Sequence, residues 1–136
     1  MKPANIDLII YQGSTFRKTF TWSTGTPGNT TPVDLTGCQI YSQARSSVLS
    51  DTVLFQLSVG DGVTITEPEA GKFELHISAE DTSAFAFKKA VYDIEIVFPN
   101  LEGDDTYRLI EGTVVIDPEV TRGLFISLLP EEEVLE

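Results

Sequence analysis

Residues 90–121, AVYDIEIVFPNLEGDDTYRLIEGTVVIDPEVT, decide the fold of this chain. In the first half Asp93 and Glu95 face one side, and large apolar side chains face the other: Tyr92, Ile94, Ile96 and Phe98. A period of two is typical of a strand that is buried on one face. Pro99 ends this strand, and a second strand is expected from Thr106 to Asp117. The stretch therefore predicts a long β-hairpin at the centre of the fold.

The second strand of this hairpin changes its alternation partway along. Leu109 belongs to one alternating set, whereas Val114 and Ile116 belong to the other. A glycine at such a change usually marks a β-bulge. We therefore predict a bulge near Gly112.

The rest of the chain adds short strands around the hairpin. Alternation or short apolar runs predict them over residues 6–11, 15–22, 38–45, 53–59, 63–66 and 72–77. Ser23–Pro32 has the composition of an exposed loop, and Ser78 could cap a short helical stretch up to Phe87. About eight or nine strands without intervening helices predict an all-β fold: a single antiparallel immunoglobulin-like β-sandwich with one short helical turn.

Length and composition are those of one globular domain. The chain has 136 residues, of which 41% are hydrophobic. A chain of this length can bury a core without disulfides or metals. We expect a sandwich domain over residues 1–122, followed by a segment over 123–136 that is first apolar and then acidic.

The charge excludes some classes of partner. The formal net charge of −12 repels phosphate backbones, so direct nucleic-acid binding is not expected.

No apolar run is long enough to span a membrane, and the N-terminus lacks the features of a signal peptide. The single cysteine, Cys38, cannot form an internal disulfide, as expected of a chain that folds in a reducing cytosol.

Side chains that could support catalysis are few. His76, the only histidine, is expected on the solvent face with Lys72 and Glu74, whereas Cys38 is expected to face the core. Asp93 and Glu95 could act as a carboxylate pair, but the polar face of any strand gives the same spacing. We therefore expect no catalytic residues, no cofactor and no enzyme activity.

Metal sites are not expected either. Glu102, Asp104 and Asp105 carry the oxygen ligands that calcium prefers, but they lack the spacing of a calcium-binding loop. No group of residues has zinc-site spacing.

The segment Gly123–Pro130 is unusual because its apolar side chains have no matching polar face. They are Leu124, Phe125, Ile126, Leu128 and Leu129. Either they form a last strand that is buried on both faces, or they add to the sheet edge of a neighbouring chain. We name them as a candidate oligomer interface.

Several strings along the chain resemble a known family. They are Ile9–Phe16 (IIYQGSTF), Phe20–Trp22 (FTW), Pro32–Ile40 (PVDLTGCQI), Lys72–Thr82 (KFELHISAEDT), Val91–Ile96 (VYDIEI) and Tyr107–Arg122 (YRLIEGTVVIDPEVTR). Their order is similar to that in a family of structural β-sandwich proteins of tailed bacteriophages. That family includes the long-tail-fibre collar proteins of siphophages, which form a ring around the distal tail and attach the side fibres.

The resemblance implies a non-enzymatic virion protein of the phage tail that assembles in the host cytoplasm. Its expected partners are other tail proteins (the tail tube or baseplate hub and the side tail fibres) and further copies of itself in a ring. A capsid decoration or neck protein on the same fold is one alternative. A carbohydrate-binding sandwich is another, for which Tyr41 and Tyr107 are the outward aromatic candidates.

Overall fold

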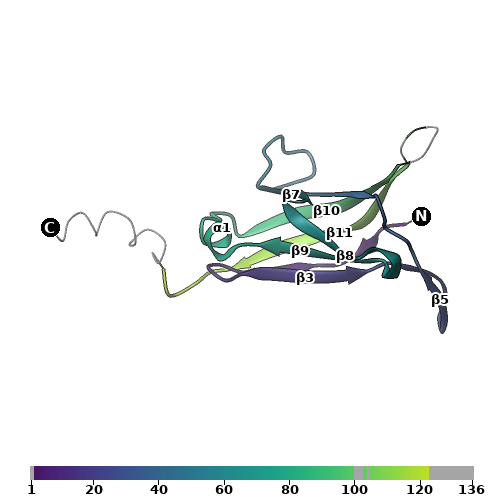
Figure 1. Ribbon diagram of the computed structural model, residues 1–136. Helices are drawn as coiled ribbons and strands as arrows, with labels where there is room; N and C mark the ends of the chain where they lie inside the picture. Colours follow the sequence, from purple (N-terminus) through teal and green to yellow (C-terminus); the bar gives the residue numbers. More distant parts are fainter. Residues whose placement is uncertain (1, 100–102, 104, 123–136) are drawn as a thin grey trace.

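The computed structural model describes residues 2–99, 103 and 105–122, and it confirms the predicted β-sandwich (Figure 1). The strands are β1 (Ala4–Asn5), β2 (Leu8–Tyr11), β3 (Phe16–Thr21), β4 (Ser23–Thr26), β5 (Asn29–Pro32), β6 (Gln39–Arg45), β7 (Phe55–Val59), β8 (Gly62–Glu67), β9 (Lys72–Ile77), β10 (Lys89–Phe98) and β11 (Asp105–Asp117). A 3-10 turn, η1 (Pro68–Ala70), and a short helix, α1 (Ala79–Ser83), complete the described elements.

Nine of these strands form one curled sheet. Its order is β1-β11-β10-β6-β7-β8-β9-β3, and β2 also pairs with β11. The curl brings β8, β9 and β3 into one layer, opposite the layer that contains β10, β11 and β7 (Figure 1). The strands β1 and β3 are thus the two ends of a single sheet folded on itself.

The core lies between the two layers and follows the predicted alternation. On β10 the fully or nearly fully buried residues are Ala90, Tyr92, Ile94 and Ile96. Across the core, β9 buries Phe73, Leu75 and Ile77. Burial of these apolar faces is the main stabilising contribution to such a fold.

The sheet is mixed, whereas the sequence predicted antiparallel pairing throughout. Most neighbours are antiparallel, but β1 and β2 run parallel to β11, and β7 runs parallel to β8. The direction of β2 follows from the connection to β3, because the chain must enter the second layer at the end of the sandwich where β11 also finishes (Figure 1).

The predicted first strand over residues 6–11 forms only at Leu8–Tyr11 as β2, and the short strand β1 lies before the predicted range. The break lies at Asp7, whose carboxylate accepts a hydrogen bond of 3.0 Å from the backbone N–H of Thr113. This bond takes the place of a backbone pair, and it lowers the pKa of Asp7.

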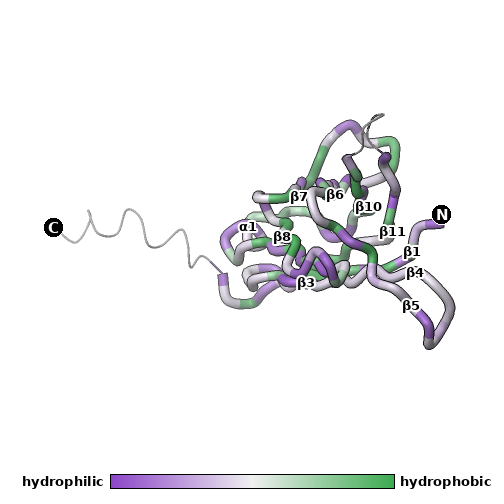
Figure 2. The backbone as a smooth tube through the Cα atoms, turned by 45° about the vertical axis from the view of Figure 1, so that its right-hand side comes forward, coloured by the Kyte–Doolittle hydropathy of each residue, from purple (hydrophilic) through white to green (hydrophobic). Residues whose placement is uncertain are grey.

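The predicted loop Ser23–Pro32 is a two-stranded hairpin, β4–β5, so the loop prediction was wrong. All eight strand residues are exposed, and Figure 2 shows the hairpin projecting from the sandwich. Pro27 and Gly28 (φ +82°) supply the turn, as Pro followed by Gly does in a type II turn. The strands escaped prediction because they have no apolar face.

The predicted bulge exists but is not at Gly112. The β10–β11 register shifts where Ile94 pairs with Ile110 and Glu95 pairs with Arg108, which leaves Leu109 as the extra residue. Gly112 is required for a different reason, because a Cβ there would collide with the carbonyl oxygen of Ile6.

The helical turn was predicted correctly, although it is shorter than expected. The side-chain oxygen of Ser78 accepts a hydrogen bond of 3.1 Å from the Asp81 N–H, so Ser78 is the N-cap of α1. The helix ends at Ser83 instead of extending towards Phe87.

Candidate functional site

The outer face of the layer that contains β6, β10 and β11 carries an open groove of about 600 Å³. Its charged and amide side chains come from β1, the β1–β2 break and all three strands: Asn5, Asp7, Gln43, Arg45, Asp93, Arg108 and Glu111. The groove thus gathers acidic and basic side chains on one concave surface.

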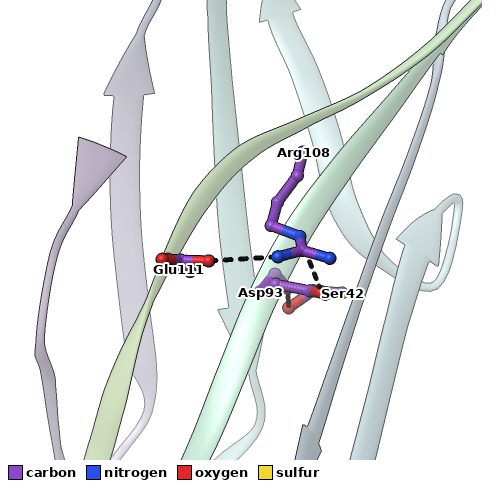
Figure 3. Close-up of polar contacts among 4 residues, drawn as sticks. All are labelled: Ser42, Asp93, Arg108 and Glu111. Atoms are coloured by element: carbon purple, nitrogen blue, oxygen red, sulfur yellow. Dashed lines mark hydrogen bonds and ion pairs between the residues drawn. The ribbon is translucent and has the colours of Figure 1, made fainter. Parts of the chain in front are cut away.

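Arg108 links two carboxylates within this groove (Figure 3). Asp93 and Glu111 are directly opposite each other on β10 and β11, an arrangement in which like charges repel. The Arg108 Nε lies 3.7 Å from Asp93 Oδ2, and an Arg108 guanidinium N–H donates to Glu111 Oε1 at 3.3 Å. The guanidinium therefore compensates the repulsion between the two acids.

The bulge places Arg108 in this position. In a regular strand, Arg108 and Glu111 are three residues apart and would face opposite sides. The extra residue at Leu109 restores them to the same outer face, and it leaves both Leu109 and Ile110 buried. A bulge that re-aims a side chain thus builds the centre of the groove.

The carboxyl group of Asp93 is half-buried. Burial raises its pKa, the neighbouring charges of Glu95 and Glu111 raise it further, and Arg108 opposes them. On the inner face, the Ser42 hydroxyl donates a 2.7 Å hydrogen bond to the Asp93 backbone oxygen, which ties β6 to β10 (Figure 3).

The sequence pattern predicts Asp93 and Glu95 as a candidate carboxylate pair, but it does not predict Arg108 and Glu111 beside them. Asp93 and Glu95 lie on the outer face as predicted, yet Asp93 pairs with Arg108 instead of lying free in solvent. The change in alternation after Leu109 is the sequence signal that points to Arg108, but the glycine in this strand places the expected bulge near Gly112 instead.

Cys38 and His76 do not form a catalytic pair. Cys38 is buried in the core, where burial, and secondarily the charge of Asp34, raises the pKa of its thiol. His76 alternates with the buried residues of β9 and so lies on the outer face of the other layer, beside Arg17 of β3. A thiol with a raised pKa is a poor nucleophile.

Tyr41 and Tyr107 do not share a flat face. Both are exposed, but Tyr41 pairs with Glu95 on the outer face, whereas Tyr107 pairs with Ile96, whose side chain faces the core. The Tyr107 ring packs edge-on against Phe98, with 6.0 Å between ring centroids. The aromatic platform expected of a carbohydrate-binding sandwich is therefore not made by these two residues.

Other predicted sites lie partly or wholly outside the described residues. They are the acidic turn with Glu102 and Asp104, and the apolar residues Leu124, Phe125, Ile126, Leu128 and Leu129. Within the described ranges, no group of three or more His, Cys, Asp or Glu side chains could hold a metal ion. No helix in the described part of the chain is long and apolar enough to cross a membrane.

Comparison with known proteins identifies the fold family. The model of the family described as "LtfC-like, beta-sandwich domain" matches residues 2–117, from before β1 to the end of β11. No curated protein matches the chain. The match confirms the family expected from the sequence, and it makes the chain a structural protein of the virion that is related to phage tail fibres. The chain belongs to the LtfC-like β-sandwich domain family.

Proposed function

We propose that this protein is a collar subunit of a phage tail, which forms a ring and attaches side tail fibres without catalysing a reaction. The observation that carries the proposal is the family match over the whole described sandwich, residues 2–117. A head-to-tail interface between identical subunits closes into a ring when the rotation between them allows it.

The charged groups of the sandwich support a structural role. Asp93 and Glu111 both form ion pairs with Arg108, so these two acids of the groove already have a positively charged partner. Cys38 is buried, and its thiol has a raised pKa. The ion pairs of Arg108 and the buried Cys38 therefore fit a role in the stability of the fold better than a role as a reactive centre.

Two projecting segments are available to hold a fibre. The loop between β6 and β7 exposes Val48 (81%) and Leu49 (92%), and the hairpin β4–β5 projects elsewhere (Figure 1). Exposed apolar side chains on a projecting loop favour contact with a partner. Apart from Pro32, neither segment belongs to the strings that resemble the collar family, so both suit contacts that differ between phages.

The segment 123–136 completes the proposal as an assembly arm. In our proposal Leu124, Phe125, Ile126, Leu128 and Leu129 supply an interface between subunits. The support is their sequence, because apolar side chains that alternate to both sides of a strand need to be covered on both faces.

The first test is the mass of the purified full-length protein by light scattering, with negative-stain images of the same peak. A closed ring supports the collar, and a monomer at all concentrations contradicts it.

Antibody labelling of intact virions then distinguishes the collar role from the decoration and neck roles. Antibody label at the distal tail would support the collar role. Label on the capsid or neck would instead support the alternative of a capsid decoration or neck protein.

The second test addresses fibre attachment. The double variant Val48→Asp/Leu49→Asp should still form rings but should lose binding to the side tail fibre protein in a pull-down. Unchanged binding would place the fibre contact elsewhere.

A further inference from the structure

The two ends of the curled sheet leave an apolar slot between them. Within the described residues, β2 pairs only with β11, and β3 pairs only with β9, so each has a free edge. The slot has a volume of about 120 Å³ and is lined by Ala4 and Ile6 from the β1 side, Phe20 and Trp22 from the β3 side, and Leu109 and Ile110 beneath. Trp22 and Ile6 are only half-buried there.

The outer face of the same edge is apolar along β2. Ile9 and Tyr11 of β2 are 55% and 59% exposed, and Val115 of β11 is 41% exposed. Ile9 and Val115 are direct partners in the β2–β11 register, so their side chains are contiguous. Further along the layer the outer face is charged, with Asp93, Arg108 and Glu111. The edge therefore carries an apolar slot at β1 and an apolar outer patch along β2, whereas Asn5 and Asp7 between them line the charged groove.

The segment Leu124–Leu129 has the pattern that such an edge requires. In an extended strand, Leu124, Ile126 and Leu128 fall on one face, and Phe125 and Leu129 fall on the other. Strand addition to a free edge gains main-chain hydrogen bonds, and alternate side chains fit the surfaces on either side. One face of the segment matches the slot, and the other matches the patch at Ile9, Tyr11 and Val115.

The described chain ends at Arg122, at the end of the sandwich that carries α1 (Figure 1). The Glu119 N–H still donates to the Gln12 side chain at 3.1 Å, but Val120 is 91% exposed, and Thr121 and Arg122 are exposed as well.

We propose that Leu124–Leu129 of one copy adds as a strand to the free β1–β2 edge of the next copy. The acceptor is then the slot at Trp22 together with the patch at Ile9. Charge agrees with this assignment, because Lys18, two residues before Phe20 on the edge strand β3, is exposed, and Glu131–Glu133 follow the apolar run. The inference rests on the ring assembly proposed above and names its interface.

The test uses two full-length variants, each of which removes one side of the interface. Ile126→Asp places a charge in the arm and leaves the edge intact, whereas Ile9→Asp places a charge on the edge and leaves the arm intact. Each should raise the dissociation constant of assembly by at least about 30-fold in sedimentation velocity. Leu49→Asp, which also puts an acid at an exposed apolar position, is the matched control and should assemble like the wild type.

Mixing the two variants gives the decisive result. The intact arm of the Ile9→Asp chain can enter the intact edge of the Ile126→Asp chain, but neither remaining end can continue the assembly. We expect a 1:1 dimer, accompanied by a blue shift in the emission of Trp22, the only tryptophan. Circular dichroism verifies that both variants are folded.

The remaining outcomes overturn the inference. If the mixture stays monomeric, the segment does not add to this edge in another copy, and packing on its own sheet becomes the better account. If both variants form rings as the wild type does, the interface lies elsewhere, while the collar proposal stands. A wild-type chain that is monomeric at every concentration contradicts the ring and this interface together.

Discussion

The chain contains two β-hairpins that differ in what they cover. The hairpin β10–β11 alternates between core and solvent along its first strand and contributes residues such as Ile94 and Val114 to the core. The hairpin β4–β5 has four residues in each strand, and all of them are exposed. Both form antiparallel pairs, so the direction of pairing does not distinguish them.

The difference shows that strand pairing and fold stability are separate properties. An isolated two-stranded hairpin is marginally stable in water, because backbone hydrogen bonds replace bonds to water at little net gain. The hairpin β10–β11 is stabilised by burial, whereas β4–β5 depends on its turn and on attachment to the sandwich. Substitutions in the two hairpins should therefore have very different costs.

The largest effect is expected at Ile94, which is fully buried at the centre of β10. Ile94→Ala should lower the free energy of unfolding by about 2–5 kcal/mol, because it removes buried apolar atoms and leaves a cavity. Urea unfolding followed by circular dichroism measures this change. A loss below about 1 kcal/mol would mean that the core around β10 collapses to fill the space.

A smaller effect is expected at Tyr92, whose hydroxyl donates a 2.6 Å hydrogen bond to the backbone oxygen of Ile6. Tyr92 pairs with Gly112, so the missing side chain there lets the N-terminal strand approach closely. Tyr92→Phe should cost about 1–2 kcal/mol by leaving that oxygen without its partner. Hydrogen exchange at the Ile6 amide should increase. Unchanged exchange would show that the hydroxyl does not hold the strand.

Asp93 on the polar face of β10 should affect stability in a pH-dependent way. Its pKa is raised above the ordinary value of 3.8, so the folded state holds this proton more tightly than the unfolded state does. As pH rises from about 3.8 through the raised pKa, the wild type should therefore lose stability relative to Asp93→Asn. Unfolding curves at several pH values measure this difference. A difference that is constant across the range would contradict the assignment.

The smallest effect is expected in β4–β5. Thr31→Ala should change the free energy of unfolding by less than about 0.5 kcal/mol, because the side chain is exposed and covers no core. The same urea assay as for Ile94 gives a direct comparison. A cost similar to that of Ile94→Ala would show that the hairpin packs against the sandwich.

Much of the fold could be predicted because burial leaves a periodic trace in the sequence. The inward sets of β6, β9 and β10 and the cap at Ser78 were all predicted from residue order alone. Hairpin β4–β5 left no such trace, since a strand exposed on both faces has no reason to alternate.

The candidate site was less predictable because it depends on cross-strand register. Leu109 and Ile110 are both apolar and both buried, so the sequence does not say which is the extra residue. Only the pairing with β10 decides this, and with it the face on which Arg108 lies. Likewise, whether Tyr41 and Tyr107 share a face depends on their partners, Glu95 and Ile96, and not on their own spacing.

The parallel pairing of the first and last strands has a mechanical consequence. Because β1 and β2 run parallel to β11, the N-terminal strand and the end of β11 emerge at opposite ends of the sandwich (Figure 1). A pull on the two ends slides the strands past each other, so their hydrogen bonds must rupture together and not one after another. The domain should therefore resist tension along its length more strongly than a pull that peels β3 from β9, and single-molecule force spectroscopy along the two directions would measure the difference.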